Sequence, residues 1–260
     1  MEGYDASTYG DRWADVYDDW YADLDDTEAC VRFLATLAGE PAAAGTLVEL
    51  GIGTGRLAIP LHGLGYDVRG IDASAAMVDQ LHAKPGGASI PVTLGDMAEV
   101  AVPAAAGGNG ADEGTRCAGV FVAYNTFFNL STEAAQRRCL ERVAAVLEPN
   151  GWFACAQFVP DERVASGRAS DVGVRSITTD RVVLTADRYD ASNQTITGQY
   201  IDISAAGIAL RPVHIRYLFP HQLDDLAAAA GLERTERYAD WARTPYDDGA
   251  VMHVSVYRRA

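Results

Sequence analysis

Short apolar runs alternate with segments of helical periodicity between residues 46 and 159 of this 260-residue chain. We predict strands at the apolar runs, over 46–50, 66–72, 90–94, 119–124 and 152–159. We predict helices between them, over 54–64, 74–84 and 131–148, and a surface loop over 101–116. Because repeated strand–helix units place their strands parallel with helices on both faces, the chain is expected to be an α/β protein with a doubly wound sheet.

The pattern changes after Pro160. Three segments rich in Val, Ile, Thr and Tyr follow, near 174–189, 194–204 and 208–219, joined by the turn signals "YDASN" and "SAAG". They predict an antiparallel β meander inserted over 161–219. A helix over 221–230 and strands over 232–239 and 250–257 then return to the first pattern. We therefore expect a single domain over 1–260, whose core comprises 41–160 and 220–260.

Aromatic residues recur at helical spacing near the N-terminus. They are Tyr9, Trp13, Tyr17, Trp20 and Tyr21, with Val16 among them. This spacing predicts one amphipathic helix with an aromatic face, followed by a second helix from Thr27 to Ala38. Residues 1–40 are thus expected to be helical. The aromatic face can simply pack on the core. For Trp13 and Trp20 this interpretation is as well supported as a role in binding.

Composition excludes several classes of partner. With 36 acidic against 21 basic residues, the formal net charge is −15, which opposes binding to nucleic acid and to anionic membranes. No uncharged apolar stretch reaches the roughly 18 residues that a membrane span needs. The four cysteines have no spacing typical of metal ligands or of paired disulfides. Buried free thiols, and hence a reducing cytoplasm, are the favoured interpretation.

The stretch "ELGIGTG" follows the first predicted strand and opens a helix. Glycines at such a turn expose backbone N–H groups at the carboxyl edge of a sheet, where doubly wound folds bind ligands. Gly51, Gly53 and Gly55 are spaced as GxGxG, which differs from the GxGxxG of dinucleotide-binding folds. Glu49 stands just before them and could accept hydrogen bonds from a cationic or hydroxylated ligand.

These residues resemble motif I of class I S-adenosylmethionine-dependent methyltransferases, and the likeness extends over roughly residues 40–160. It implies a Rossmann-like sheet of seven strands and S-adenosylmethionine as the cofactor. Asp72, in "GIDAS", matches the acidic residue that binds both ribose hydroxyls in this family. A carboxylate suits a vicinal diol because its oxygens accept several hydrogen bonds. Helix capping is the alternative role of Asp72.

Further matches follow in order along the chain. Asp96 and Met97, in "GDM", resemble the position that contacts adenine, and Met77 resembles the apolar residue packed against it. The alternative role of Met77 is packing in the core. The alternative for Asp96 is that it simply ends a strand, as acidic residues often do. "AYNTFFNL", which contains Tyr124, resembles motif IV, where the methyl donor and the acceptor meet.

Four residues are candidates for the catalytic end of the site. Similar small-molecule enzymes fold an N-terminal segment over the cofactor as a lid, which favours Tyr17 and Tyr21, with Tyr17 at the methionine end. Asn129 could orient the acceptor, although capping of the next helix competes with that role. His214 could be a general base, although a lone histidine is more often structural.

The resemblance points to bacterial enzymes of specialised metabolism that methylate a small-molecule acceptor at N, O or C. Amino sugars and aromatic or indole-type compounds are the acceptor classes that it implies. The insertion would either roof the active site or form the contact of a homodimer. A nicotinamide-dependent reductase and a non-catalytic cofactor-binding protein are the alternative interpretations.

Overall fold

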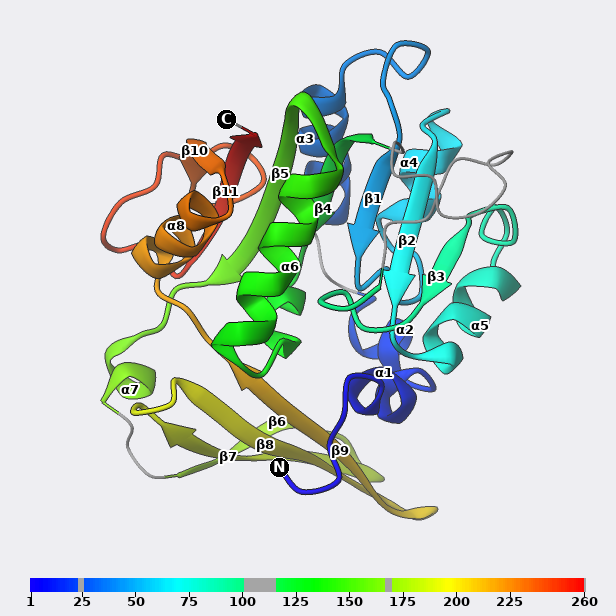
Figure 1. Cartoon of the computed structure of the whole chain (residues 1–260). Coiled ribbons are helices and arrows are strands. Elements are labelled where there is room, and N and C mark those ends of the chain that lie inside the picture. The colour runs from blue at the N-terminus through cyan, green and yellow to red at the C-terminus, as the bar shows by residue number, and fades with distance from the viewer. Residues whose placement is uncertain (23–25, 101–115, 167–169, 260) are drawn as a thin grey trace.

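The computed structural model describes residues 1–22, 26–100, 116–166 and 170–259. A seven-stranded sheet lies at its centre, in the order β3-β2-β1-β4-β5-β11-β10 (Figure 1). The strands are β1 (Leu47–Leu50), β2 (Val68–Asp72), β3 (Val92–Leu94), β4 (Cys117–Val122), β5 (Leu147–Phe158), β10 (Leu232–Tyr238) and β11 (Met252–Arg259). Strands β1 to β5 are parallel to one another, whereas β11 is antiparallel to both β5 and β10. The predicted α/β class with a mostly parallel sheet is confirmed.

Helices cover both faces of this sheet (Figure 1). They are α3 (Thr27–Ala38), α4 (Ala58–Gly63), α5 (Ala75–Ala83), α6 (Glu133–Val146) and α8 (Pro220–Ala229), with the short 3₁₀ helix η1 (Thr126–Asn129) after β4. Two apolar layers result, one including α3 and α4 and the other including α6 and α8. Hydroxyl caps start two of the helices: Ser74 accepts from the N–H of Met77, and Thr132 from that of Ala135.

Two expectations from composition can be compared with this fold. All four cysteines are buried and free, as expected. In the part of the chain that the structure describes, no helix has the length and apolar character needed to cross a bilayer. The loop expected over 101–116 lies outside the described residues except for Arg116, whose guanidinium donates to the carbonyl of Leu147.

The insertion forms a separate antiparallel sheet beneath the main one, preceded by the short helix α7 (Glu162–Ala165) (Figure 1). Its strands pair in chain order: β6 (Asp171–Ile177), β7 (Arg181–Asp190), β8 (Thr195–Ser204) and β9 (Gly207–Arg216). The single predicted segment 174–189 is therefore two strands. A turn divides it, because the hydroxyl of Thr178 bonds Asp180 and its N–H donates to the carbonyl of Arg181.

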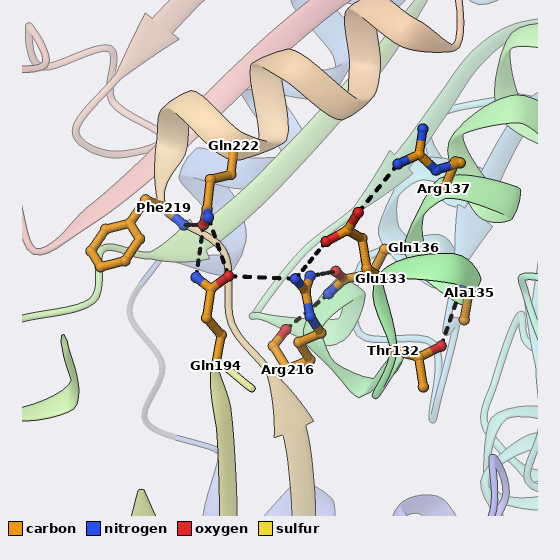
Figure 2. Close-up of polar contacts among 9 residues, drawn as sticks. All are labelled: Thr132, Glu133, Ala135, Gln136, Arg137, Gln194, Arg216, Phe219 and Gln222. Atoms are coloured by element: carbon orange, nitrogen blue, oxygen red, sulfur yellow. Dashed lines mark hydrogen bonds and ion pairs between the residues drawn. The ribbon is translucent and has the colours of Figure 1, made fainter. Parts of the chain in front are cut away.

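Arg216, at the end of β9, ties this second sheet to the main body (Figure 2). Its guanidinium donates to Gln136 at 2.5 Å and to Glu133 at 3.0 Å, both on α6. It also reaches Gln194, which bonds Gln222 of α8. Burial lowers the pKa of Arg216, and the Glu133 carboxylate opposes that shift. The two sheets are thus joined by a network in which each buried polar group has a partner.

The N-terminal segment contains two short helices, α1 (Thr8–Trp13) and α2 (Tyr17–Trp20), in place of the single predicted helix. In a continuous helix, the carbonyl of Arg12 would accept from the N–H of residue 16. Here it accepts from the guanidinium of Arg211 on β9, while Val16 bonds the carbonyl of Trp13. A tertiary contact that the local pattern does not contain therefore interrupts the helix.

Candidate functional site

A cavity opens at the carboxyl ends of β1, β2, β3 and β4, beneath the N-terminal helices. Of the residues predicted to bind cofactor or acceptor, it is lined by Tyr17, Gly51, Gly53, Asp72, Met77, Asp96, Met97 and Asn129. These residues come from six segments of the chain, so the fold brings together groups that the sequence separates by more than a hundred positions.

A smaller cleft adjoins this cavity and contains Glu49 and Tyr124 in its walls. Tyr17, Gly51, Gly53 and Thr126 line both spaces. The two clefts therefore meet at the glycine turn, with Tyr17 of α2 on one side and Thr126 of η1 on the other.

The glycine turn is shaped by close approaches within the protein. A Cβ at Gly51, where φ is +66°, would lie 2.3 Å from the Thr126 methyl group. At Gly55, where φ is +82°, it would lie 2.9 Å from Leu81 of α5. Gly55 does not line either cleft, so the structure places it at a packing contact rather than beside a ligand.

Asp72 fastens this turn to β2. One carboxylate oxygen accepts from the N–H of Gly53 at 2.7 Å and the other from the N–H of Ser74 at 2.8 Å. Burial raises the pKa of Asp72, and these backbone hydrogen bonds oppose the shift. Each oxygen retains acceptor capacity toward the cavity that Asp72 lines.

The smaller cleft holds an acid and a base whose side chains have buried polar atoms without hydrogen-bond partners. Oε2 of Glu49 and all three guanidinium nitrogens of Arg56 are buried with no partner among the described residues. Burial raises the pKa of Glu49 well above its usual range, and nearby Arg56 acts in the opposite direction. Since unpaired buried charges are costly, the pair is suited to a ligand that carries both a negative and a positive group.

Tyr124 positions Arg56. Its ring lies 3.5 Å beneath the guanidinium carbon, and its hydroxyl donates to Asp26 at 3.1 Å. The backbone of Tyr124 has φ +53°, a conformation that turns the chain sharply after β4. Arg56 was missed from the sequence, although it follows the last glycine of the turn directly.

Aspartates on α1 and α2 hold the N-terminal segment over the clefts. Asp18 accepts from the Thr54 hydroxyl and pairs with Lys84, both at 2.6 Å. Asp11 accepts from the Ser74 hydroxyl at 2.6 Å. The glycine turn and the start of α5 are thus both bonded to this segment.

The two predicted tyrosines occupy different positions in that segment. Tyr17 lines both clefts, and burial raises its pKa to about 12, so the phenol stays neutral. Tyr21 lines neither cleft, and its ring packs 4.8 Å from that of Tyr17. Trp13 is fully buried and donates to the carbonyl of Pro212, so its role is in packing.

His214 lies outside both clefts. Its Nδ1 bonds the Thr197 hydroxyl at 2.9 Å, and its ring contacts the edge of Tyr4. Burial lowers the pKa of His214. Tyr4 itself lines the larger cavity, as does Tyr9, and sequence reasoning gave neither of them a site role. His214 thus contacts a residue of the cavity wall but does not itself line the cavity.

The sheet order, with one antiparallel strand inserted next to an edge and a ligand cavity at the carboxyl ends of β1 to β4, defines the class I methyltransferase fold. A protein-family profile described as "Methyltransferase domain" matches residues 47–151. The structure of the CcbJ methyltransferase from Streptomyces caelestis is 36% identical, with a TM-score of 0.85, and the match covers 99% of this chain and 100% of that one. The chain belongs to the family of S-adenosylmethionine-dependent methyltransferases.

More distant structures share this fold. CalS10, an amino pentose methyltransferase from Micromonospora echinaspora involved in calicheamicin biosynthesis, is 18% identical with a TM-score of 0.67, covering 94% of this chain and 97% of its own. The sugar N-methyltransferase KedS8 from Streptoalloteichus is 21% identical with a TM-score of 0.66, covering 100% and 99%. A comparison with curated proteins gives no significant match. The assignment replaces the nicotinamide-dependent reductase considered from the sequence.

Proposed function

We propose that this enzyme transfers the methyl group of S-adenosylmethionine to an amino group of a small molecule of the amino-sugar type. The observation that carries the proposal is the junction of the two clefts between Tyr17 and Thr126. The charged smaller cleft on one side of that junction fits the methionine end of the donor. The acid-lined larger cavity on the other side fits its nucleoside end.

The smaller cleft would hold the methionine end of the cofactor. Arg56 offers unpartnered N–H donors for an α-carboxylate, and Glu49 offers an unpartnered oxygen for an α-ammonium group. In the larger cavity, Asp72 would bind the ribose hydroxyls. Asp96, Met97 and Met77 would surround the adenine. Gly51 and Gly53, which lack side chains, would allow the cofactor to pass close to the backbone between the methionine end and the ribose.

The cofactor supplies a methyl group already activated by a positive sulfur. The protein then needs mainly to align an acceptor and to exclude water, which proximity and orientation achieve. Tyr17 would face the sulfonium, because an aromatic face attracts a cation. Tyr21 would position Tyr17, and Asn129 would orient the acceptor. His214, which lies outside both clefts, would hold the ring of Tyr4 in place, and the proton that the acceptor loses would pass to solvent.

The lining of the larger cavity favours an amine. Asp5 lines it in addition to Asp72 and Asp96, which we assign to the cofactor, and none of the described lining residues is Lys, Arg or His. A free amine is already a nucleophile, so no strong base beside it is required. The amino pentose and sugar N-methyltransferases with the same fold support this choice. The tyrosines of the cavity keep aromatic acceptors as a second candidate class.

The setting that we propose is specialised metabolism in the bacterial cytoplasm. The free buried thiols are consistent with a reducing compartment. CalS10, which is involved in calicheamicin biosynthesis, supports the pathway type.

The direct test is incubation with S-adenosylmethionine labelled on its methyl group and a panel of amino sugars, phenols and indoles, followed by mass spectrometry. We expect one methyl group on an amine, with a rate that rises with pH as the amine loses its proton. Methylation of phenols or indoles alone would assign the acceptor to the second class. Cofactor binding without turnover on any class would favour a non-catalytic role.

Calorimetry with S-adenosylhomocysteine tests the placement of the ribose. Asp72→Ala should weaken binding by about 1–3 kcal/mol through loss of charge-assisted hydrogen bonds. Asp79→Ala, which removes an exposed carboxylate from the same region, is the control and should leave affinity unchanged. Equal affinities for the two variants would show that the ribose lies elsewhere.

A further inference from the structure

Part of the wall of the larger cavity is not used by the cofactor as placed above. With the ribose at Asp72 and the adenine at Asp96, the lining residues that remain come from two segments, 4–10 and 126–135. Asp5 is the single charged side chain in this remaining part of the described lining. The other polar groups there are neutral and belong to Tyr4, Tyr9, Thr126, Asn129 and Ser131.

The two carboxylate oxygens of Asp5 have different surroundings. Oδ1 accepts from the N–H groups of Ser7 and Thr8, at 3.1 and 3.0 Å, and from the Thr8 hydroxyl at 2.7 Å. These bonds fix the turn that leads into α1, as a capping residue does. Within the described residues every hydrogen bond to this carboxylate goes to Oδ1, which leaves Oδ2 as an open acceptor. The hydrogen bonds from Thr8 and Ser7 also lower the pKa of Asp5, so the group is ionised at neutral pH.

A chain of polar contacts fixes Asp5 relative to the cofactor site. The Ser7 hydroxyl lies 3.1 Å from Oδ1 of Asp5 and 2.8 Å from the carboxylate of Asp11. Asp11 accepts from the Ser74 hydroxyl at 2.6 Å. The N–H of Ser74 donates to Asp72, the residue that we place at the ribose. The open oxygen of Asp5 therefore has a defined position with respect to the bound donor.

We propose that Asp5 is the residue that selects an amine as the acceptor, through a hydrogen bond from the amino group to Oδ2. This inference rests on the proposed function. In the transfer, the nitrogen lone pair forms the bond to the methyl carbon while the electron pair of the S–C bond returns to sulfur. The positive charge thus moves from sulfur to nitrogen, and the ammonium product then loses a proton to solvent.

A carboxylate beside the nitrogen favours this change in charge. It attracts the acceptor in its ammonium form and stabilises the positive charge that develops on nitrogen during transfer. The hydrogen bond that it accepts also fixes the direction of the lone pair after the amine has lost its proton. A phenol reacts as its anion, which the same carboxylate repels. Asp5 therefore discriminates between the two acceptor classes considered above.

The experiment compares Asp5→Asn with the unaltered chain in steady-state kinetics. The change keeps Oδ1 and its hydrogen bonds but replaces the anionic Oδ2 with an NH₂ group. The probes are the amine that is methylated fastest in the labelled panel and its analogue with a hydroxyl in place of the amino group. We expect the KM of the amine to rise about fivefold. The hydroxyl analogue, used as a competitive inhibitor, should bind both proteins equally, as should S-adenosylhomocysteine.

Two control variants separate the charge of Asp5 from its structural role. Glu2→Gln removes one charge from an exposed residue that lines neither cleft. Thr8→Val removes the hydroxyl that bonds Oδ1 but leaves the carboxylate in place. Both variants should keep the KM of the unaltered protein. Circular dichroism checks folding, and Asp5→Ser, which retains a capping oxygen, replaces Asp5→Asn if that variant does not fold.

An unchanged KM for Asp5→Asn, with amines still methylated, would overturn this inference and leave the proposed function standing. An equal rise in KM for Thr8→Val would also overturn it, because the ordered turn and not the charge would then matter. Weaker binding of S-adenosylhomocysteine to Asp5→Asn would instead place Asp5 at the cofactor. Failure of the unaltered protein to methylate any amine would overturn the proposed function itself, and this inference with it.

Discussion

The fold encloses the guanidinium groups of two arginines, Arg216 and Arg56. The two groups differ in whether they have hydrogen-bond partners. Arg216 donates to Gln136, Glu133 and Gln194, so its site is complete without any ligand (Figure 2). Arg56 has a tyrosine ring beneath it and no hydrogen-bond partner for any of its three nitrogens within the described residues. A buried network with all partners present holds two parts of a fold together, whereas an incomplete one is suited to a ligand.

Two acids, Asp202 of the inserted sheet and Glu49 of β1, show the same difference. In the inserted sheet, the carboxylate of Asp202 pairs with Arg181 at 2.5 Å and lies 4.0 Å from Arg211. At the edge of the main sheet, Glu49 has an unpartnered oxygen. Substitutions in the two regions should therefore change different quantities, stability in one and affinity in the other.

The largest effect is expected for Arg216→Met. The change leaves Oε1 of Gln136, a fully buried side chain, without its partner. We expect a loss of about 3 kcal/mol in the free energy of unfolding. Urea denaturation measures it, and calorimetry with S-adenosylhomocysteine should show an unchanged dissociation constant. A loss of affinity at full stability would reverse our assignment of the two arginines.

Arg56→Met should lower the affinity for the cofactor and leave the stability of the free protein unchanged. Removal of the groups proposed for the α-carboxylate should weaken S-adenosylhomocysteine binding by about 100-fold, or about 2.7 kcal/mol. The melting temperature of the free protein should not fall, because no hydrogen bond of the folded chain is lost. Adenosine, which lacks the amino-acid end, is the control ligand and should bind both proteins equally.

Glu49→Gln should change how stability depends on pH. Burial raises the folded-state pKa of Glu49 above its usual 4.5, so the protonated side chain stabilises the free protein below that value. This contribution is lost as pH rises through the raised pKa. The variant should therefore melt higher than the unaltered free protein near neutral pH. It should also bind S-adenosylhomocysteine about tenfold more weakly there, because the charged acid that we place beside the ammonium group is gone.

Melting curves between about pH 5 and 8, with and without S-adenosylhomocysteine, measure both effects. The pKa of Asp72 is also raised by burial, so part of the pH dependence should remain in the variant. Identical curves for the two proteins would show that Glu49 titrates in the folded state as it does in the unfolded chain.

The smallest effect is expected for Trp20→Ala. It removes the ring that lies among three guanidinium groups of the inserted sheet, each contact contributing about 0.5–1 kcal/mol at an exposed site. We expect S-adenosylhomocysteine to dissociate about fivefold faster, as measured by stopped flow. Tyr246→Ala, which removes a cation–π contact with Arg237 away from the clefts, should leave the rate unchanged. Equal rates for all three proteins would show that the inserted sheet does not help to hold α1 and α2.

Much of the fold could be predicted because local periodicity in the sequence indicates its strands and helices. The strands and helices of the main sheet alternate along the chain, and the turn at Gly51 follows from residues adjacent in sequence. The break between α1 and α2 could not be predicted in this way. It depends on a hydrogen bond from Arg211, about two hundred positions away.

The residues of the candidate site also fall into those that local sequence patterns predict and those that depend on the folded structure. Asp72, Asp96 and Met77 reach the cavity because the ends of parallel strands meet at one edge of a sheet. Gly55 shares the pattern of the turn, but its close neighbour is Leu81. Arg56 escaped notice because a single basic residue has no sequence signature, and its unsatisfied donors exist only once the fold encloses them.

Asp11, Asp15 and Asp18 fasten one short segment to three places: the start of α5, strand β9 and the glycine turn with Lys84. Any opening of that segment must break all three contacts together. Two of them join full charges, so dissolved ions compete with them directly. We therefore expect S-adenosylhomocysteine to dissociate faster at high ionic strength if its release requires that opening.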